Sequence, residues 1–380
     1  MALRRVAALA ALLLLALLAC TPAGPPPSGA APPAPTAAAT PQAEAAPAPE
    51  ATAARPALPT TPTSLPVGTL ALDSWAGVFI ADARGYFREL GLAVELVPFA
   101  NGTDMRPALL NGDLAVGGAG LNAGTINLIG RNTDVKIVAD LESYRAGHQA
   151  ADALVVRKDL WDSGAIRTAK DLEGRDVYGP GGPGGGLFLQ LMRWADREGL
   201  DKSKLAMTNM GTSEIRAALA GGAIDVGFVS EPNLTAGLDA GEFVILADGQ
   251  DMYPGQQILV LQYNVRAMDA AGPRAGERFM LAYLRGVRDY VNAMVYHQDQ
   301  ESVIDVLVQY TAVKDHEVYR HSRPSWIDPN GRVNVANLPA DAAVYVQAGI
   351  IPAVPNLDHA YASEYADYAV GYLGEYRPPS

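Results

Sequence analysis

Cysteine is almost absent from the chain, since Cys20 is the only one in 380 residues. A single cysteine excludes a disulfide bond within the chain and a metal site built on several thiolates. The five histidines are scattered without the spacing of metal ligands, and no G-x-S-x-G sequence or other nucleophile signature is present. The sequence therefore favours a protein that is not an enzyme and that uses no cofactor or metal.

Basic residues and long hydrophobic runs are also scarce. Lysine and arginine number 29 against 41 acidic residues, and the net charge is −12. A nucleic-acid partner requires a basic face, so that class of function is disfavoured. The apolar run of residues 7–18 is too short to span a bilayer, which takes about 20 apolar residues in a helix.

The N-terminus has the features of a secretory signal. Arg4 and Arg5 precede the apolar run, and the run ends in Leu17-Leu18-Ala19-Cys20, which resembles a bacterial lipobox. We expect residues 1–19 to be a lipoprotein signal peptide and Cys20 to be acylated, with an ordinary signal and an incidental cysteine as the alternative. A lipid on Cys20 predicts an extracytoplasmic protein anchored to the cell membrane.

Residues 20–66 consist almost entirely of Ala, Pro, Thr, Gly and Ser. Such a segment cannot bury enough apolar surface to offset the entropy of the chain, and its prolines favour extended conformations. We expect a disordered Ala/Pro-rich tether that holds the folded part away from the membrane.

The remainder of the chain alternates between strand and helix patterns. Strands are expected at 67–72, 92–98, 114–116, 135–141, 151–157, 176–178, 205–210, 224–229 and 257–262. Helices are expected at 77–90, 104–110, 122–129, 187–198, 213–220, 276–297 and 301–309. Strands separated by helices indicate parallel βαβ units and an α/β fold.

The strands form two similar series, which predicts two lobes. Residues 67–149 are expected to form lobe 1 and residues 150–259 lobe 2. Residues 260–380 are expected to return to lobe 1 and to add C-terminal helices, so that two hinge crossings join the lobes. The alternative is two consecutive domains without a return.

Several sequence blocks are similar to one known family. The run 77–96 (GVFIADARGYFRELGLAVEL) is followed by 108–117 (ALLNGDLAVG), which recurs as 218–227 (ALAGGAIDVG). Ser230-Glu231-Pro232 and 328–334 (DPNGRVN) follow in order. Together these blocks resemble the NMT1/THI5-like solute-binding family, with the difference that Ala115 stands where aspartate is usual.

The resemblance implies a type II periplasmic-binding-protein fold, in which two α/β lobes close around a ligand cleft. It also implies that a small-molecule ligand, an ABC permease and the ATPase of that permease are the partners. A monomer is expected. Binding proteins for thiamine pyrimidine precursors, riboflavin, alkanesulfonates, taurine and nitrate belong to this family.

Candidate ligand contacts follow the strands, because ligands of open α/β sheets bind at the carboxyl ends of the strands. Asp73 is a hydrogen-bond acceptor or a helix cap, and Trp75 is a stacking surface, as pyrimidine-binding relatives imply, or a packing residue. Tyr144 is expected as a second aromatic wall. Further contacts from lobe 1 are expected at Asn101, Asn122 and Glu142.

Lobe 2 is expected to contribute helix N-termini and an acid. Gly184 lies in a glycine-rich run before a helix, and Thr212 lies before another, where free N–H groups bind anions or carbonyl oxygens. Glu231 lies at the crossover, where it contacts the ligand or forms a hinge salt bridge. Tyr253 precedes the return strand and is also a candidate.

The charges at these positions favour a particular class of ligand. Asp73, Glu142 and Glu231 outnumber the one nearby arginine, Arg145, and a sulfonate or nitrate prefers donors and positive charge. Acceptors and aromatic rings suit a small heteroaromatic nutrient, either a thiamine pyrimidine precursor or a riboflavin-like vitamin. An alkanesulfonate, taurine or nitrate is the alternative, and a pyrimidine-synthase-type enzyme is the least favoured.

Overall fold

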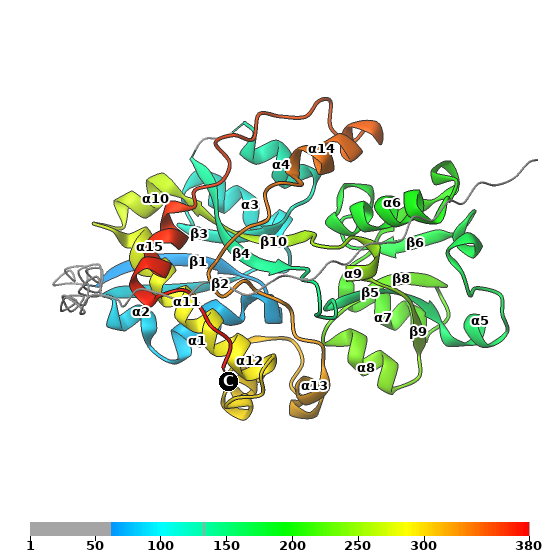
Figure 1. Cartoon of the computed structure of the whole chain (residues 1–380), viewed down its shortest axis with the longest axis horizontal. Coiled ribbons are helices and arrows are strands. Elements are labelled where there is room, and N and C mark those ends of the chain that lie inside the picture. Colours follow the sequence, from blue (N-terminus) through cyan, green and yellow to red (C-terminus); the bar gives the residue numbers. More distant parts are fainter. Residues whose placement is uncertain (1–61, 132–133, 380) are drawn as a thin grey trace, which may run out of the picture. The chain divides into compact units, whose positions relative to one another are not determined.

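The computed structural model describes residues 62–131 and 134–379 as two α/β lobes, each built on a five-stranded sheet (Figure 1). The expected signal peptide, Cys20 and the segment up to residue 61 lie outside the described residues. Within the described part, no helix combines the length and the apolar character needed to cross a membrane.

The sheet of lobe 1 has the strand order β2-β1-β3-β10-β4. The bounds are β1 Thr63–Thr69, β2 Leu92–Pro98, β3 Val116–Gly120, β4 Val135–Ser143 and β10 Gln257–Asn264. β10 is antiparallel to both of its neighbours, so the sheet is mixed. β1 starts four residues before the expected Val67, and it pairs in parallel with β2 from Thr63 onward. Residues 63–66 therefore belong to the sheet.

The expected helix 77–90 is two helices, α1 (Ala76–Ala83) and α2 (Tyr86–Glu89), preceded by a 3-10 helix at Asp73–Trp75. The break falls at Gly85, whose φ of 76° lies in the left-handed region that glycine adopts without strain. The expectation of one continuous helix was therefore wrong at this position. The turn directs Phe87 into the core.

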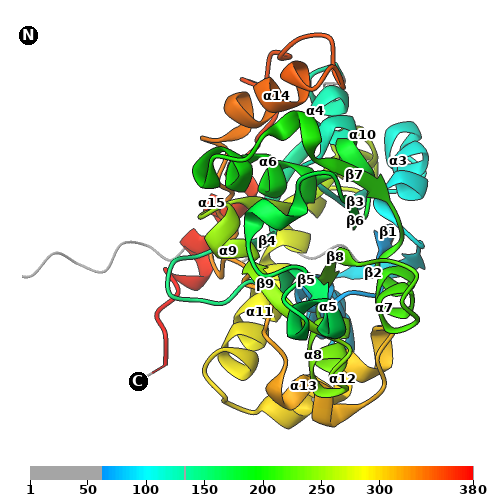
Figure 2. The same ribbon diagram turned by 90° about the vertical axis from the view of Figure 1, so that its right-hand side faces the viewer.

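The other helices of lobe 1 cover both faces of its sheet (Figures 1 and 2). They are α3 (Gly102–Asn111), α4 (Ala123–Ile129), α10 (Val265–Ala270), α11 (Ala275–Met294), α12 (Gln300–Tyr310) and α15 (Glu364–Leu373). α11 is the central one, since most of its residues are buried. It packs closely on α1, because Gly77 and Gly286 let the two backbones approach.

The sheet of lobe 2 has the order β7-β6-β8-β5-β9. Its strands are β5 Asp152–Arg157, β6 Asp176–Gly179, β7 Ala206–Asn209, β8 Val226–Ser230 and β9 Phe243–Asp248, of which β9 was not expected. Its helices are α5 (Lys158–Asp162), α6 (Gly186–Glu198), α7 (Thr212–Ala220), α8 (Asn233–Asp239) and α9 (Gly249–Met252). β5 runs antiparallel to β8 and β9, as β10 does to its neighbours in lobe 1.

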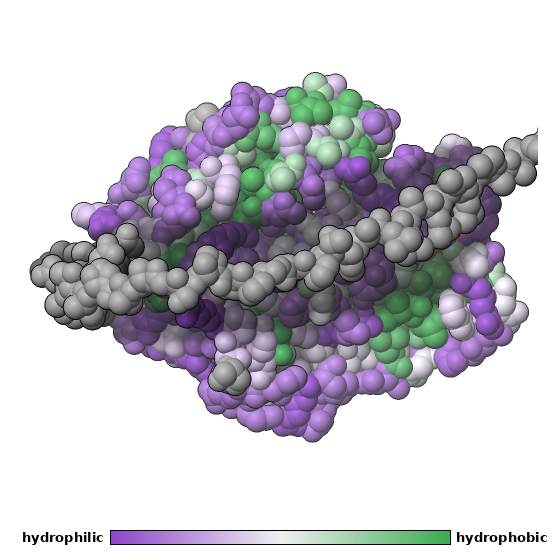
Figure 3. Space-filling view, viewed as in Figure 1, coloured by the Kyte–Doolittle hydropathy of each residue, from purple (hydrophilic) through white to green (hydrophobic). Residues whose placement is uncertain are grey.

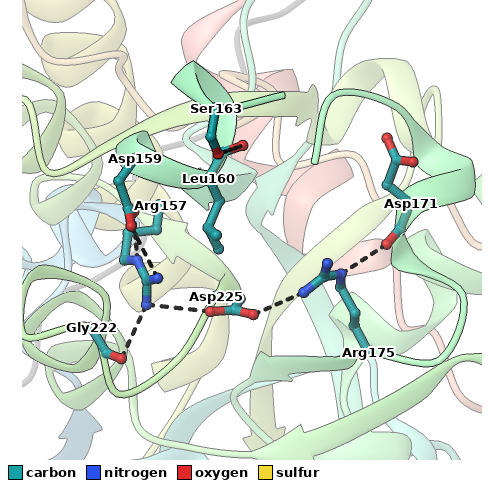
Figure 4. A network of polar contacts seen from close by, with 8 residues as sticks. All are labelled: Arg157, Asp159, Leu160, Ser163, Asp171, Arg175, Gly222 and Asp225. Carbon is teal, nitrogen blue, oxygen red and sulfur yellow. Dashed lines mark hydrogen bonds and ion pairs between the residues drawn. The ribbon is translucent and has the colours of Figure 1, made fainter. Parts of the chain in front are cut away.

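The repeated sequence block has a structural role in lobe 2. The Asp225 carboxylate lies 3.3 Å from Arg157 Nη1 and 3.0 Å from Arg175 Nη1, and it bridges the two arginines (Figure 4). Its carbonyl also accepts from Arg157 N–H, as Ala115 accepts from Asn264 N–H in lobe 1. The backbone bond is thus common to both lobes, and the ionic bridge belongs to lobe 2.

Two backbone crossings and the C-terminal third of the chain connect the lobes. Residues 144–151 lead from β4 to β5, and residues 249–256 lead from β9 to β10. Beyond α12, α13 (His316–His321) packs against α8 of lobe 2, and α14 (Leu338–Gln347) packs against α4 and α6. The C-terminal third therefore contacts both lobes.

The visible face in Figure 3 is mainly hydrophilic, with hydrophobic residues in separate groups.

Candidate functional site

Four carboxyl groups from both lobes converge where the lobes meet. Asp73 follows β1 and Glu142 is near the end of β4, while Asp152 starts β5 and Glu231 follows β8. Asp73, Asp152 and Glu231 are buried, and Glu142 is half-buried. We call these four residues the carboxylate cluster. Two of them flank the crossing 144–151, so the cluster lies at the hinge side of the lobes.

Tyr144 and Gln190 connect to the lobe 2 side of the cluster. The Tyr144 hydroxyl donates to Asp152 Oδ1, and Gln190 Nε2 lies 2.5 Å from Tyr144 Oη and 3.2 Å from Asp152 Oδ2. Gln190 comes from α6 and is fully buried. These bonds fix the first residue of the crossing against lobe 2.

A segment from the C-terminal third, residues 323–325, bonds to three of the four carboxylates of the cluster. Arg323 N–H donates to Glu231 at 3.2 Å, and its guanidinium pairs with Asp248 at 2.7 Å. Ser325 N–H lies 3.4 Å from Asp73 Oδ2, and its hydroxyl donates to Glu142 Oε1 at 3.2 Å. We call residues 323–325 the strap, because they join carboxylates of both lobes.

Burial shifts the titration of the cluster towards the protonated state. Loss of hydration raises the pKa of Asp73 to about 6 and that of Asp152 to about 6, against partial compensation by hydrogen bonds. The pKa of Glu142 is raised well above its usual value by burial and then by the charges of Asp73 and Asp152. The pKa of Glu231 is also raised by burial, although Thr235 and the strap donate to it. Ionised carboxylates are therefore poorly hydrated here and repel one another, so that each negative charge is costly.

Four polar atoms on residues next to the cluster are buried without a hydrogen-bond partner in the described part of the chain. Two are Tyr290 Oη on α11 and Gln190 Oε1 on α6, and the other two, Ser74 Oγ and Trp75 Nε1, directly follow Asp73. Burial, followed by the charges of Asp73 and Glu142, raises the pKa of Tyr290 well above its usual value, and the nearby backbone N–H of Ser325 opposes that rise. The hydroxyl therefore lies close to the cluster and to residues 323–325. Such atoms are uncommon in folded proteins, and a bound molecule is one way to satisfy them.

Asp73, Glu142, Tyr144 and Glu231 are the predicted site residues that the structure brings together. Trp75 is two residues beyond Asp73 in the same 3-10 helix and has no exposed surface. Its ring packs against Gly118 in the core of lobe 1. This position supports the packing alternative for Trp75, and no open stacking face is present on it.

The remaining predicted residues have other surroundings. The side chains of Asn101 and Asn122 cap α3 and α4 by accepting backbone N–H bonds. Gly184 and Thr212 lie at the starts of α6 and α7 without a contact to the cluster. Tyr253 donates its hydroxyl to Asp341 of α14 at 2.5 Å, beside Arg193. These residues stay predictions as ligand contacts.

Sequence reasoning missed five contributors to the site. Asp152 had a signal, since an acidic residue at the start of an apolar strand needs a buried partner. The others come from helices or loops far away in the sequence, and no local pattern marks them. The five are Asp152, Gln190, Tyr290, Arg323 and Ser325.

An open groove of about 290 Å³ lies beside the cluster on the hinge side. Trp326 lines it, with Arg145 at 4.5 Å from its ring centre and His148 at 4.4 Å. The groove shares Tyr144 with the surroundings of the cluster but contains none of its four carboxylates. We assign the candidate site to the cluster, because both lobes and the unpartnered buried atoms meet there.

Metal binding has no geometric support in residues 62–131 and 134–379. No group of three or more His, Cys, Asp or Glu side chains among them is arranged to hold an ion. The carboxylates of the cluster instead accept from hydroxyl, amide and backbone donors.

Several solved structures have the same fold as this chain. The ligand-binding component of an ABC-type import system from Staphylococcus aureus, crystallised with zinc, has a TM-score of 0.65 at 16% identity, over 81% of this chain and 99% of that one. The alkanesulfonate-binding protein SsuA from Xanthomonas axonopodis pv. citri, bound to MOPS, has a TM-score of 0.63 at 19% identity, over 80% of this chain and 100% of that one. The nitrate-binding protein NrtA from Synechocystis PCC 6803 has a TM-score of 0.63 at 16% identity, over 84% of this chain and 90% of that one. The fold is therefore the two-lobed periplasmic-binding-protein fold of type II.

The family follows from the sequence itself. A family model described as NMT1/THI5 like matches residues 73–292, which is more than half of the chain. The chain belongs to the NMT1/THI5-like family, as the sequence blocks predicted. A comparison with curated proteins found no match.

Proposed function

We propose that this chain is the solute-binding lipoprotein of an ABC importer, and that it captures a small heteroaromatic nutrient between its lobes. It then delivers the nutrient to the permease, which the ATPase drives. The convergence of Asp73, Glu142, Asp152 and Glu231 from both lobes supports this proposal. A ligand bound there contacts both lobes at once, so its binding energy favours their closure.

The chemistry of the cluster supports a ligand that donates hydrogen bonds. Buried carboxylates accept from ring N–H, amino and hydroxyl groups, and the rings of Tyr144 and Tyr290 are buried in the same region. A thiamine pyrimidine precursor or a riboflavin-like vitamin has these groups. A sulfonate or nitrate would add negative charge to a site that already concentrates it, which disfavours that alternative.

Capture and release, without chemical conversion, is the proposed activity. Closure of two lobes about a hinge captures a ligand without making or breaking a covalent bond. Acylation of Cys20 would keep the protein at the cell membrane, outside the cytoplasm, near its permease. Residues 20–62 would then serve as the tether, and a monomer suffices for this function.

A thermal-shift screen of the purified full chain tests the proposal. The panel contains 4-amino-5-hydroxymethyl-2-methylpyrimidine, thiamine, riboflavin, taurine, an alkanesulfonate and nitrate. We expect an aminopyrimidine or riboflavin to raise Tm, since a ligand at 100 times its Kd adds about 2.7 kcal/mol to stability. A shift with taurine, the alkanesulfonate or nitrate alone would move the protein to the alternative class. No shift with any organic solute would contradict solute binding.

A further inference from the structure

The carboxylates at the centre of the molecule differ in how fully protein donors occupy them. Glu231 accepts from Thr235 N–H at 3.0 Å, from the Thr235 hydroxyl at 2.8 Å and from the strap at 3.2 Å. Asp152 accepts from Tyr144 and Gln190, and Asp248 is paired with Arg323. Because a carboxylate offers about four acceptor positions, these groups are largely served by the protein.

Glu142 has the fewest donors, and Asp73 accepts only from Ser325 and from backbone N–H groups of its own turn. Ser325 is the one residue outside their own turn that donates to them in the described structure, at 3.4 Å and 3.2 Å. Neither carboxyl forms an ion pair with any arginine, lysine or histidine of the described residues. The one guanidinium at the cluster, that of Arg323, is held by Asp248. Two adjacent acids therefore lack a matching positive charge.

Two of the unpartnered buried atoms belong to side chains close to carboxyl groups of the cluster. Tyr290 has no exposed surface, and its hydroxyl lies within the field of both Asp73 and Glu142. Gln190, also without exposed surface, approaches from lobe 2, with its Oε1 unused while its Nε2 bonds to Asp152. A buried polar atom without a partner costs about 1–3 kcal/mol, so donors placed here are favoured.

We infer that Asp73 and Glu142 form the recognition site for an organic cation, a small ligand with an ammonium or amidinium group whose N–H groups donate to both carboxylates. The inference rests on the proposed function and specifies the charge of its ligand. An amidinium is suited because its parallel N–H groups make charge-assisted bonds to two acceptors. Its remaining N–H groups reach Tyr290 Oη or Gln190 Oε1 as acceptors.

Three compounds of nearly identical shape test the charge: benzamidinium, benzamide and benzoate. Titration calorimetry of the full chain at pH 7.5 is expected to show benzamidinium binding at least tenfold more tightly than benzamide, with benzoate weakest. Equal affinities, or tighter binding of benzamide or benzoate, would overturn the cation inference and leave solute binding intact. Binding of none of the three, in a protein that binds a neutral or anionic member of the screening panel, would overturn it too.

A variant series shows whether the preference comes from this pair. Glu142→Gln keeps the shape of the side chain and removes its charge, and we expect it to reduce the preference for benzamidinium over benzamide at least fivefold. Glu301→Gln is the matched control, because Glu301 is exposed and pairs with Arg320 on α13. A preference that survives in both Glu142→Gln and Asp73→Asn would place the cation elsewhere. Melting curves without ligand verify that each variant is folded.

Failure of the inference and failure of the proposed function give different results. If the panel produces a ligand but the charge series shows no cation preference, the protein is a solute receptor of another specificity. If neither the panel nor the three probes bind, both proposals are contradicted.

Discussion

Individual residues at the centre of this protein are held in states that water would not favour. Asp73, Asp140 and Asp152 are buried acids, and burial raises the pKa of Asp140 to about 7 although Gln257, Ser143 and the Asp328 N–H bond to it. Asp140 accepts from Gln257, Ser143 and the Asp328 N–H, whereas Asp73 accepts only from Ser325 and its own turn. The same residue type therefore has donors from three separate positions in one case, and in the other it is the acid that we propose to meet a ligand.

The raised pKa of Asp73 makes stability depend on pH. The folded state binds the proton of Asp73 more tightly than the unfolded state, in which the pKa is near 3.8. The protonated carboxyl therefore adds its full stabilisation below pH 3.8. This stabilisation is lost as the pH rises through about 6. Above that pH, where Asp73 is ionised in both states, the free energy of unfolding is lower by at most about 3 kcal/mol. We expect the urea midpoint of the ligand-free protein to decrease between pH 4.5 and pH 7, and Asp73→Asn to flatten that decrease.

The control for this measurement is Asp269→Asn, which removes an exposed carboxylate on α10. In this variant the urea midpoint should decrease with pH as steeply as in the unsubstituted protein. A slope that Asp73→Asn does not change would show that Asp73 is not a source of the pH dependence.

At the scale of elements, the packing of α1 on α11 supports the site. The 3-10 helix that contains Asp73 leads directly into α1, and α11 carries Tyr290. The two helices touch where Gly77 meets Gly286, and a Cβ on Gly286 would clash with the Gly77 carbonyl oxygen. A displacement of α1 there would move Asp73 relative to Tyr290.

Gly286→Ala is therefore expected to lower the free energy of unfolding by about 1–3 kcal/mol, as overpacking does in cores, despite the better helix propensity of alanine. Gly371→Ala in α15 is the matched control, since open space surrounds that position. It should raise stability by about 0.5–1 kcal/mol. Thermal or urea unfolding measures both, and changes of the same sign would contradict the role of the close contact.

At the scale of the whole folded part, the strap is a third connection between the lobes. The crossings 144–151 and 249–256 are continuous backbone, whereas residues 323–325 connect through hydrogen bonds and one ion pair. Opening of the lobes would have to break some of these bonds. We therefore expect the strap to contribute to the energy that resists separation of the lobes.

Arg323→Gln removes the ion pair with Asp248, in which both side chains are 18% exposed, and keeps the backbone bond to Glu231. A hydrogen bond between charged groups contributes about 1.5–3 kcal/mol, so we expect amide exchange in residues 249–256 to become roughly tenfold faster or more. Arg332→Gln is the control, because its pair with Glu375 is exposed. Unchanged exchange in Arg323→Gln would mean that the strap does not restrain the lobes.

Much of the fold was predictable from local pattern. β2 matches its expected bounds, and most other strands and helices lie within a few residues of theirs, because apolar periodicity and capping residues such as Asn122 act over short distances. The errors have local causes as well. A left-handed Gly85 divided one helix, and the less regular β9 carried too weak a pattern to be recognised.

The site was predictable only in part, because the strand-end rule identifies residues near the ligand without saying which way they face. It nominated Asp73, Glu142 and Glu231, which do converge, and it also nominated Trp75, which turns into the core. Ser325 and Gln190 do not lie directly after any strand expected from the sequence, so the strand-end rule could not identify them. Their roles depend on how α6 and the strap pack against distant segments.

The sequence by itself determined the family, the two α/β series and the excess of acidic groups at the strand ends, since each of these depends on residue order or composition. Only the tertiary structure decided which acids share a site and which have donors. Contacts between Asp73, Glu142 and residues 323–325 join positions about 180 to 250 residues apart. The environment of a carboxylate, and hence its charge and its partner, depends on burial by such distant segments, and burial has no representation in a local pattern.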